Sequence, residues 1–191
     1  MKIAKIETRA LEMPYTKPLV TATNHFTVAR GLLVTVGTDQ GIEGYGYSDL
    51  FPPTGETPET AQHVVQSVLK AKVVGKELED LARIRSGIDH VLTGHPRAKS
   101  ALESAMVDAL ARSYHMPLFL MLGGKFRHEI KVIKMVSVGD PEAMAQEAKQ
   151  LAGEGLSLKL KVSGKFEKDL PRVAAVREAV GDSVFIKIDA N

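Results

Sequence analysis

The chain of 191 residues lacks cysteine and tryptophan altogether, and aromatic residues make up only 5% of it. Without cysteine it forms no disulfide, has no thiol nucleophile and offers no thiolate to a metal, which fits the reducing cytoplasm. No apolar run approaches the roughly 20 residues that a membrane helix needs. The opening segment MKIAKIETRALEMPY also lacks the apolar core of a secretory signal. We therefore expect a soluble, cytoplasmic protein that does not bind membranes.

An excess of charge of one sign is missing as well. The 25 Lys and Arg residues nearly balance the 23 Asp and Glu residues, so the net charge is only +2, and no five like charges follow one another. This balance argues against a nucleic-acid partner. The hydrophobic share of 44% and the charged share of 25% are ordinary for globular proteins. The length suffices for one or two domains with a substantial core.

The first part of the chain has the pattern of antiparallel strands followed by helices. Residues 3–13 form a strand-like run that we expect Pro14 to end. Residues 26–36 and 42–47 are rich in β-forming residues and flank the turn at 38–41, which predicts a hairpin.

Three glycines in this region, Gly41, Gly44 and Gly46, resemble a phosphate-binding loop only superficially. A dinucleotide fingerprint lies between a strand and a helix, whereas these glycines lie within a predicted strand. We expect bulges or a close approach of another backbone instead. The strongest predicted helix covers 98–114 and carries a stripe of mostly small side chains, which permits close packing: Ala101, Leu102, Ala105, Met106, Ala109 and Leu110.

From about residue 130 strands and helices alternate. Strands are predicted at 131–138, 156–162 and 184–189, with helices starting at Asp140-Pro141 and covering 170–180. Strand–helix–strand units of this kind form parallel sheets with right-handed crossovers. We therefore expect a βαβαβ arrangement.

Two of these strands carry polar residues on one face. Side chains two apart in a strand share a face, so Lys159 and Lys161 point one way, as do Lys187, Asp189 and Asn191 on the next strand. A sheet covered by helices on both faces has nearly apolar strands, which favours a barrel over an open doubly wound sheet. Ligands in such folds bind at the carboxyl ends of the strands, where Lys161 and Asp189 lie.

At these residues the chain resembles the enolase superfamily, in particular its mandelate racemase and muconate lactonizing enzyme branch. The features that match, in order, are the opening MKIAKIETRALEMPYTKPL, the segment AKSALESAMVDALARSYHMPLFLMLGG, the Lys-x-Lys at 159–161, LPRVAAVREAVG and the final Asp-Ala-Asn at 189–191. The resemblance implies an α+β capping domain over residues 1–125. Residues 126–191 would then begin a modified (β/α) TIM-type barrel, incomplete at about three strands.

The resemblance also implies a reaction and its residues. A Mg²⁺-dependent isomerase (a racemase, epimerase or cycloisomerase) would remove the α-proton of a small carboxylate substrate to give an enediolate, which a hard dication stabilises. Asp189 matches a ligand of Mg²⁺, or of Mn²⁺, and Asn191 a position beside the metal ligands. Lys161 matches the acid/base, and Lys159 the neighbour that supports charge near the substrate carboxylate. Loop residues that match substrate contacts by position are Thr21, Thr23, Asn24, His25, Tyr47 and Phe51.

Other functions stay open at this point. Acid-sugar dehydratases and succinylbenzoate synthases of the same superfamily would share this half of the chain. A Schiff-base aldolase would use Lys161 as nucleophile and would not need Asp189. Further metal ligands and an opposite-face acid/base would lie beyond Asn191, so we expect the N-terminal half of a longer, homo-oligomeric enzyme. The remaining alternative is a catalytically dead truncated product or an interaction module.

Overall fold

A computed structural model describes residues 1–22, 24–51 and 55–190, and the chain divides into two compact units. The first unit comprises Met1–Pro14 and Val28–Phe126, and the second comprises Tyr15–Thr27 and Arg127–Asn191. The sequence-based domain boundary at residue 125 stays a prediction. The structural grouping differs from it in one respect, because it assigns residues 15–27 to the second unit.

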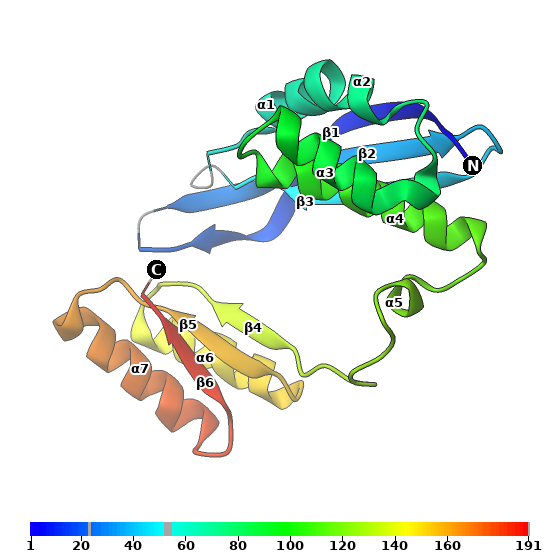
Figure 1. The fold of residues 1–191 in the computed structure, drawn as a ribbon. Coiled ribbons are helices and arrows are strands. Elements are labelled where there is room, and N and C mark those ends of the chain that lie inside the picture. The colour runs from blue at the N-terminus through cyan, green and yellow to red at the C-terminus, as the bar shows by residue number, and fades with distance from the viewer. Residues whose placement is uncertain (23, 52–54, 191) are drawn as a thin grey trace. The chain divides into compact units, whose positions relative to one another are not determined.

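The first part of the chain forms a three-stranded sheet with helices on one face (Figure 1). The strand order is β1-β2-β3, and β2 pairs antiparallel with β3. Side chains from the sheet and the helices share one apolar core. In chain order the elements are β1 (Ile3–Val20), β2 (His25–Thr38), β3 (Glu43–Asp49), α1 (Pro58–His63), the π-helical η2 (Val64–Leu69), α2 (Lys70–Val73), the 3₁₀ turn η3 (Leu78–Asp80), α3 (Leu81–Val91), α4 (Pro96–Ser113) and α5 (Leu118–Met121).

Pro14 does not end the first strand, which corrects the sequence-based expectation. Strand β1 runs through it to Val20. Proline cannot donate a ladder hydrogen bond, but an edge strand has one side on which no donor is needed. β1 is the edge of its sheet, and this position in the fold is not visible in the local sequence.

The glycines of β3 serve close packing against α4. A Cβ on Gly46 would lie 2.0 Å from the carbonyl oxygen of Ala101, and one on Gly44 would lie 2.2 Å from the amide nitrogen of Ala109. The alanines of α4 that face β3 are fully buried. The small-residue stripe and the strand glycines therefore let the helix and the strand approach each other closely, as the sequence predicted.

Two helix starts in this unit have side-chain caps. Thr57 caps α1 in a capping box with Thr60. Helix α4 is capped from a distance by the buried carboxylate of Glu56, which accepts hydrogen bonds from the backbone nitrogens of Arg97 at 2.8 Å and Ala98 at 3.1 Å. A carboxylate at this end also complements the helix dipole.

The second unit contains the predicted βαβαβ arrangement. Its parallel sheet has the order β4-β5-β6, and α6 and α7 pack against each other on one face of it (Figure 1). Strand order that follows chain order, with both helices on the same face, is the start of a barrel rather than of a doubly wound sheet. The elements are β4 (Ile133–Val136), α6 (Pro141–Gly153), β5 (Ser157–Lys161), α7 (Phe166–Val180) and β6 (Ile186–Asp189).

Helix α7 begins four residues before the predicted start. The sequence predicted a start at Leu170, but the helix starts at Phe166 and includes Pro171 in its interior. The turn before α7 is organised by hydrogen bonds to Asp169, which are described below.

Among the described residues, no helix is long and apolar enough to cross a membrane.

Candidate active site at the carboxyl ends of β5 and β6

The register of the parallel sheet puts the polar residues of two strands side by side. Lys159 is paired with Lys187, and Lys161 with Asp189. Leu158 and Leu160, which alternate with Lys159 and Lys161 along β5, are fully buried in the core beneath the helices. Because side chains alternate along a strand, the lysines and the aspartate lie on the face that the helices do not cover.

One carboxylate oxygen joins the three central groups. Oδ2 of Asp189 lies 2.6 Å from Nζ of Lys159 and 2.9 Å from Nζ of Lys161. The side chain of Lys161 is only 10% exposed, against 31% for Lys159. A buried ammonium is costly unless it is paired, so the aspartate stabilises Lys161 in this position. The structure thus brings together the three residues that the sequence predicted to converge.

This cluster is chemically suited to an anionic substrate. Two ammonium groups and one carboxylate leave one net positive charge, which attracts a substrate carboxylate. A largely buried amine at the end of a strand is also positioned for proton transfer to or from a bound molecule. These roles of Lys159 and Lys161 stay predictions.

The cluster alone does not form a Mg²⁺ site. The carboxylate of Asp189 is the type of hard oxygen ligand that Mg²⁺ prefers, but the ion requires nearly octahedral coordination. Within residues 1–22, 24–51 and 55–190, no three His, Asp or Glu residues gather as a metal-binding group. Asp189 therefore fits as one ligand among several, and Asn191 lies outside the described residues.

Three of the predicted substrate contacts that the structure describes lie in the loop between β1 and β2 or at the first residue of β2. Thr21 and Asn24 close a turn, in which Thr21 N donates to Asn24 O at 2.9 Å and Asn24 N donates to Thr21 Oγ1 at 3.0 Å. His25 is exposed at the start of β2. Thr23 lies outside the described residues. A long hydrogen bond of 3.5 Å from Val20 N to Oγ of Ser137 links this loop to the carboxyl end of β4.

The other two predicted contacts, Tyr47 and Phe51, belong to the first unit. Tyr47 lies on β3, and a Cβ on Gly31 would lie 2.2 Å from its hydroxyl oxygen, so the ring lies directly over this glycine of β2. Phe51 follows β3 and is half-buried. Contacts of these residues with a substrate stay predictions.

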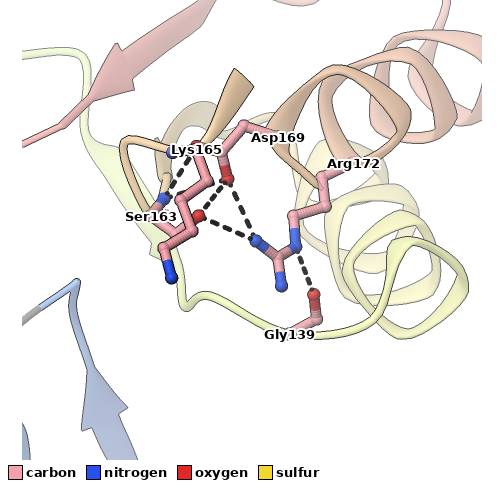
Figure 2. A network of polar contacts seen from close by, with 5 residues as sticks. All are labelled: Gly139, Ser163, Lys165, Asp169 and Arg172. Atoms are coloured by element: carbon pink, nitrogen blue, oxygen red, sulfur yellow. Dashed lines mark hydrogen bonds and ion pairs between the residues drawn. The ribbon is translucent and has the colours of Figure 1, made fainter. Parts of the chain in front are cut away.

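A second cluster of polar residues beside the site was missed by the sequence analysis. Figure 2 shows Asp169, in the first turn of α7, at its centre. Its carboxylate accepts hydrogen bonds from Ser163 N at 2.9 Å, Ser163 Oγ at 2.9 Å and Lys165 N at 3.0 Å, and it pairs with Nη1 of Arg172 at 3.0 Å. Arg172 in turn donates from Nε to the carbonyl oxygen of Gly139 at 2.8 Å. We call these five residues the Asp169 network.

The hydrogen bonds of this network change the acidity of Asp169. Burial by itself would raise the pKa of its carboxyl group, but the hydrogen bonds from Ser163, Arg172 and Lys165 outweigh burial and lower the pKa to about 2. The sequence did contain a signal, namely an aspartate and an arginine three residues apart that follow the turn at Ser163-Gly164. That spacing places both side chains on one side of a helix start.

The comparison with protein families matches residues 5–123 to "Mandelate racemase / muconate lactonizing enzyme, N-terminal domain". The L-Ala-D/L-Glu epimerase of Bacillus subtilis is 36% identical over 198 residues, covering 100% of this chain and 53% of the epimerase. The N-succinyl-L-Arg/Lys racemase of Bacillus cereus is 32% identical over 100% of this chain and 52% of its own length. Other relatives bear the names muconate cycloisomerase 1 and cis-3-hydroxy-L-proline dehydratase.

Solved structures give the same result. The crystal structure of the N-succinyl Arg/Lys racemase from Bacillus cereus superposes with a TM-score of 0.95, covering 100% of this chain and 52% of that one. A dipeptide epimerase from Cytophaga hutchinsonii, described as complexed with Mg and the dipeptide D-Ala-L-Val, is 32% identical and superposes with a TM-score of 0.92 over 100% of this chain and 52% of its own. The chain therefore spans about half the length of the relatives that it matches.

Proposed function

This chain belongs to the mandelate racemase / muconate lactonizing enzyme family of the enolase superfamily, and on that premise we propose that the whole protein is a racemase or epimerase of a carboxylate substrate. The observation that carries the proposal is the convergence of Lys159, Lys161 and Asp189 at the carboxyl ends of adjacent parallel strands. That edge is where ligands bind in barrels.

Lys161 is the residue that exchanges the α-proton of the substrate. Its side chain is the more buried of the two lysine side chains at the site, and its Nζ lies 2.9 Å from Oδ2 of Asp189. A fixed amine of this kind reacts from one side of a bound molecule, so it acts on one face of the α-carbon. Lys159, which shares the same carboxylate oxygen at 2.6 Å, adds positive charge beside the substrate carboxylate.

Asp189 is the residue of this chain that would hold a Mg²⁺ ion, together with ligands that the described residues do not supply. When bound, the ion would contribute positive charge that stabilises the negative charge growing on the substrate as the proton leaves. The carboxylate of Asp189 also orients both lysines, because each of them lies within 3 Å of its Oδ2 atom.

We propose an N-acylated amino acid as the substrate class. The N-succinyl amino acids and the dipeptides named for the relatives have this chemistry in common. In an N-succinyl amino acid and in the C-terminal residue of a dipeptide, the α-carbon carries a proton and a free carboxylate, and the α-nitrogen is part of an amide. The net positive charge of the cluster suits the carboxylate of such a molecule.

The test is α-proton exchange in D₂O, followed by NMR, with N-succinyl amino acids and dipeptides of both configurations. In the whole protein, Lys161→Ala is expected to slow exchange from one face of the substrate by about 10²–10⁴-fold, the contribution of a positioned acid/base. Lys134→Ala is the matched control. Lys134 is the register partner of Leu158 on the neighbouring strand, so it lies on the face of the sheet away from Lys161. Wild-type exchange from both faces by the Lys161→Ala protein would refute the assignment.

A further inference from the structure

The backbone that follows Lys161 is anchored by the Asp169 network, and we infer that Asp169 is a positioning residue for this lysine. The inference rests on the proposed function of Lys161 as acid/base. In the described part of the second unit, two charged residues are buried, Lys161 and Asp169, each with 8% of its surface exposed. One would perform the proton transfer, and the other fixes the segment that carries it.

The anchoring is close to Lys161 in the sequence. Lys161 is the last residue of β5. The Asp169 carboxylate accepts hydrogen bonds from the backbone amides of Ser163 and Lys165, two and four residues later. The hydroxyl of Ser163 donates to the same carboxylate. The turn between β5 and α7 is thereby tied to the first turn of the helix by both backbone and side-chain hydrogen bonds.

The residue between Lys161 and this turn is anchored in the other direction. Val162 N donates to the carbonyl oxygen of Asp189 at 3.1 Å, and this is the residue whose carboxylate binds the Lys161 amine. The backbone after Lys161 is therefore fixed first to β6 and then to α7. A shift of the turn would move the lysine relative to its carboxylate partner.

Arg172 extends the network to a third segment. Its guanidinium pairs with Asp169, donates to Oγ of Ser163 at 3.3 Å and donates to the carbonyl oxygen of Gly139, which follows β4 (Figure 2). The connections after β4 and β5 are thus joined through one ion pair. Catalytic groups need such support, since an error of about 1 Å in position costs up to about 10²-fold in rate.

The network also keeps its charge over the working pH range. With a pKa of about 2, Asp169 is an anion at every pH near neutrality. The hydrogen bonds that it accepts are charge-assisted, and these are stronger than neutral ones. The anchor therefore does not loosen as pH changes near neutrality.

Asp169→Asn in the whole protein tests this inference, because asparagine preserves the shape but removes the charge and one acceptor. We expect α-proton exchange to fall about 10- to 100-fold from the face served by Lys161, with a much smaller change from the opposite face and in KM. Glu167→Gln is the matched control. Glu167 occupies the same first turn of α7 and takes no part in the Asp169 network, so both exchange rates should stay within about twofold of wild type.

Loss of exchange from both faces to the same extent would indicate general loosening and would overturn the positioning role, as would unchanged exchange. If circular dichroism shows that the Asp169→Asn protein does not fold, Ser163→Ala provides the same test. It removes only the hydroxyl, and we expect a face-specific loss of about fivefold, the equivalent of one net hydrogen bond.

The two proposals fail in different ways. If Lys161→Ala removes exchange from one face while Asp169→Asn and Ser163→Ala leave it unchanged, the acid/base assignment stands and the positioning role is wrong. If Lys161→Ala exchanges the proton at the wild-type rate from both faces, both are wrong.

Discussion

The contact between α4 and β3 is tight enough that one added methyl group should destabilise the first unit. Gly46 is buried, and a Cβ there would lie 2.0 Å from Ala101 O and 2.5 Å from Ala105 N. Both atoms are backbone of a long helix, so neither can move like the end of a flexible side chain. Overpacking typically costs 1–3 kcal/mol, and the rigid neighbours place Gly46→Ala at about 3 kcal/mol.

Gly87→Ala is the control, and the expected effect has the opposite sign. Gly87 is exposed within α3, and a Cβ there would meet no atom within 4 Å. Alanine loses less conformational freedom than glycine on helix formation and favours helices by about 0.5–1 kcal/mol. The same substitution should therefore stabilise the protein at one position and destabilise it at the other.

Thermal unfolding followed by far-UV circular dichroism measures both effects. For a chain of this size, 1 kcal/mol shifts Tm by roughly 2–4 °C, so we expect a decrease of about 6–12 °C for Gly46→Ala and an increase of about 1–4 °C for Gly87→Ala. A Gly46→Ala protein that unfolds at or above the wild-type temperature would show that the close approach of α4 to β3 is not the constraint that we infer.

Three further outcomes follow from the structure. Asp169 has a folded-state pKa of about 2 instead of 3.8, so its ionised carboxylate stabilises the fold by about 2 kcal/mol above about pH 4, and this contribution is lost as the pH falls through 2. In acid titrations the stability difference between wild type and Asp169→Asn should therefore shrink, and a difference that stays constant down to pH 2 would contradict the assignment. Glu56→Ala leaves the amides of Arg97 and Ala98 without their cap and should lower the free energy of unfolding in urea by about 1–2 kcal/mol, whereas no change would refute the capping role. In the whole protein, EDTA should abolish α-proton exchange and added Mg²⁺ should restore it, while activity that persists in EDTA would argue against a role of Asp189 in metal binding.

The site face could be predicted from the sequence because it depends on a period of two. Once residues 156–162 and 184–189 are read as parallel strands, the shared faces of Lys159 and Lys161 and of Lys187 and Asp189 follow from strand geometry. The sheet register then places Lys161 directly beside Asp189. No loop conformation enters this inference, which is why it agrees with the structure.

Other features depend on positions that no local pattern encodes. Pro14 is tolerated in β1 because that strand is an edge, and an edge is defined only by the assembled sheet. Asp169 looks like an ordinary acidic residue in the first turn of a helix until the turn at Ser163 folds back onto it. The cap on α4 comes from Glu56, some 40 residues earlier in the chain. Turn geometry and distant partners, rather than periodicity, decide these cases.

The path of the chain through the two units limits how the protein can be divided. Residues 15–27 belong to the second unit although residues 1–14 and 28–126 form the first, so the chain passes from one unit to the other three times. A gene truncated after residue 126 would encode the first unit together with residues 15–27, without the rest of the second unit to which they belong. Proteolysis at that junction would likewise leave residues 15–27 covalently attached to the N-terminal fragment, while the rest of the second unit lies in the other fragment. The two units are therefore not interchangeable modules, and a chimera with a relative must take residues 15–27 and residues 127–191 from the same parent.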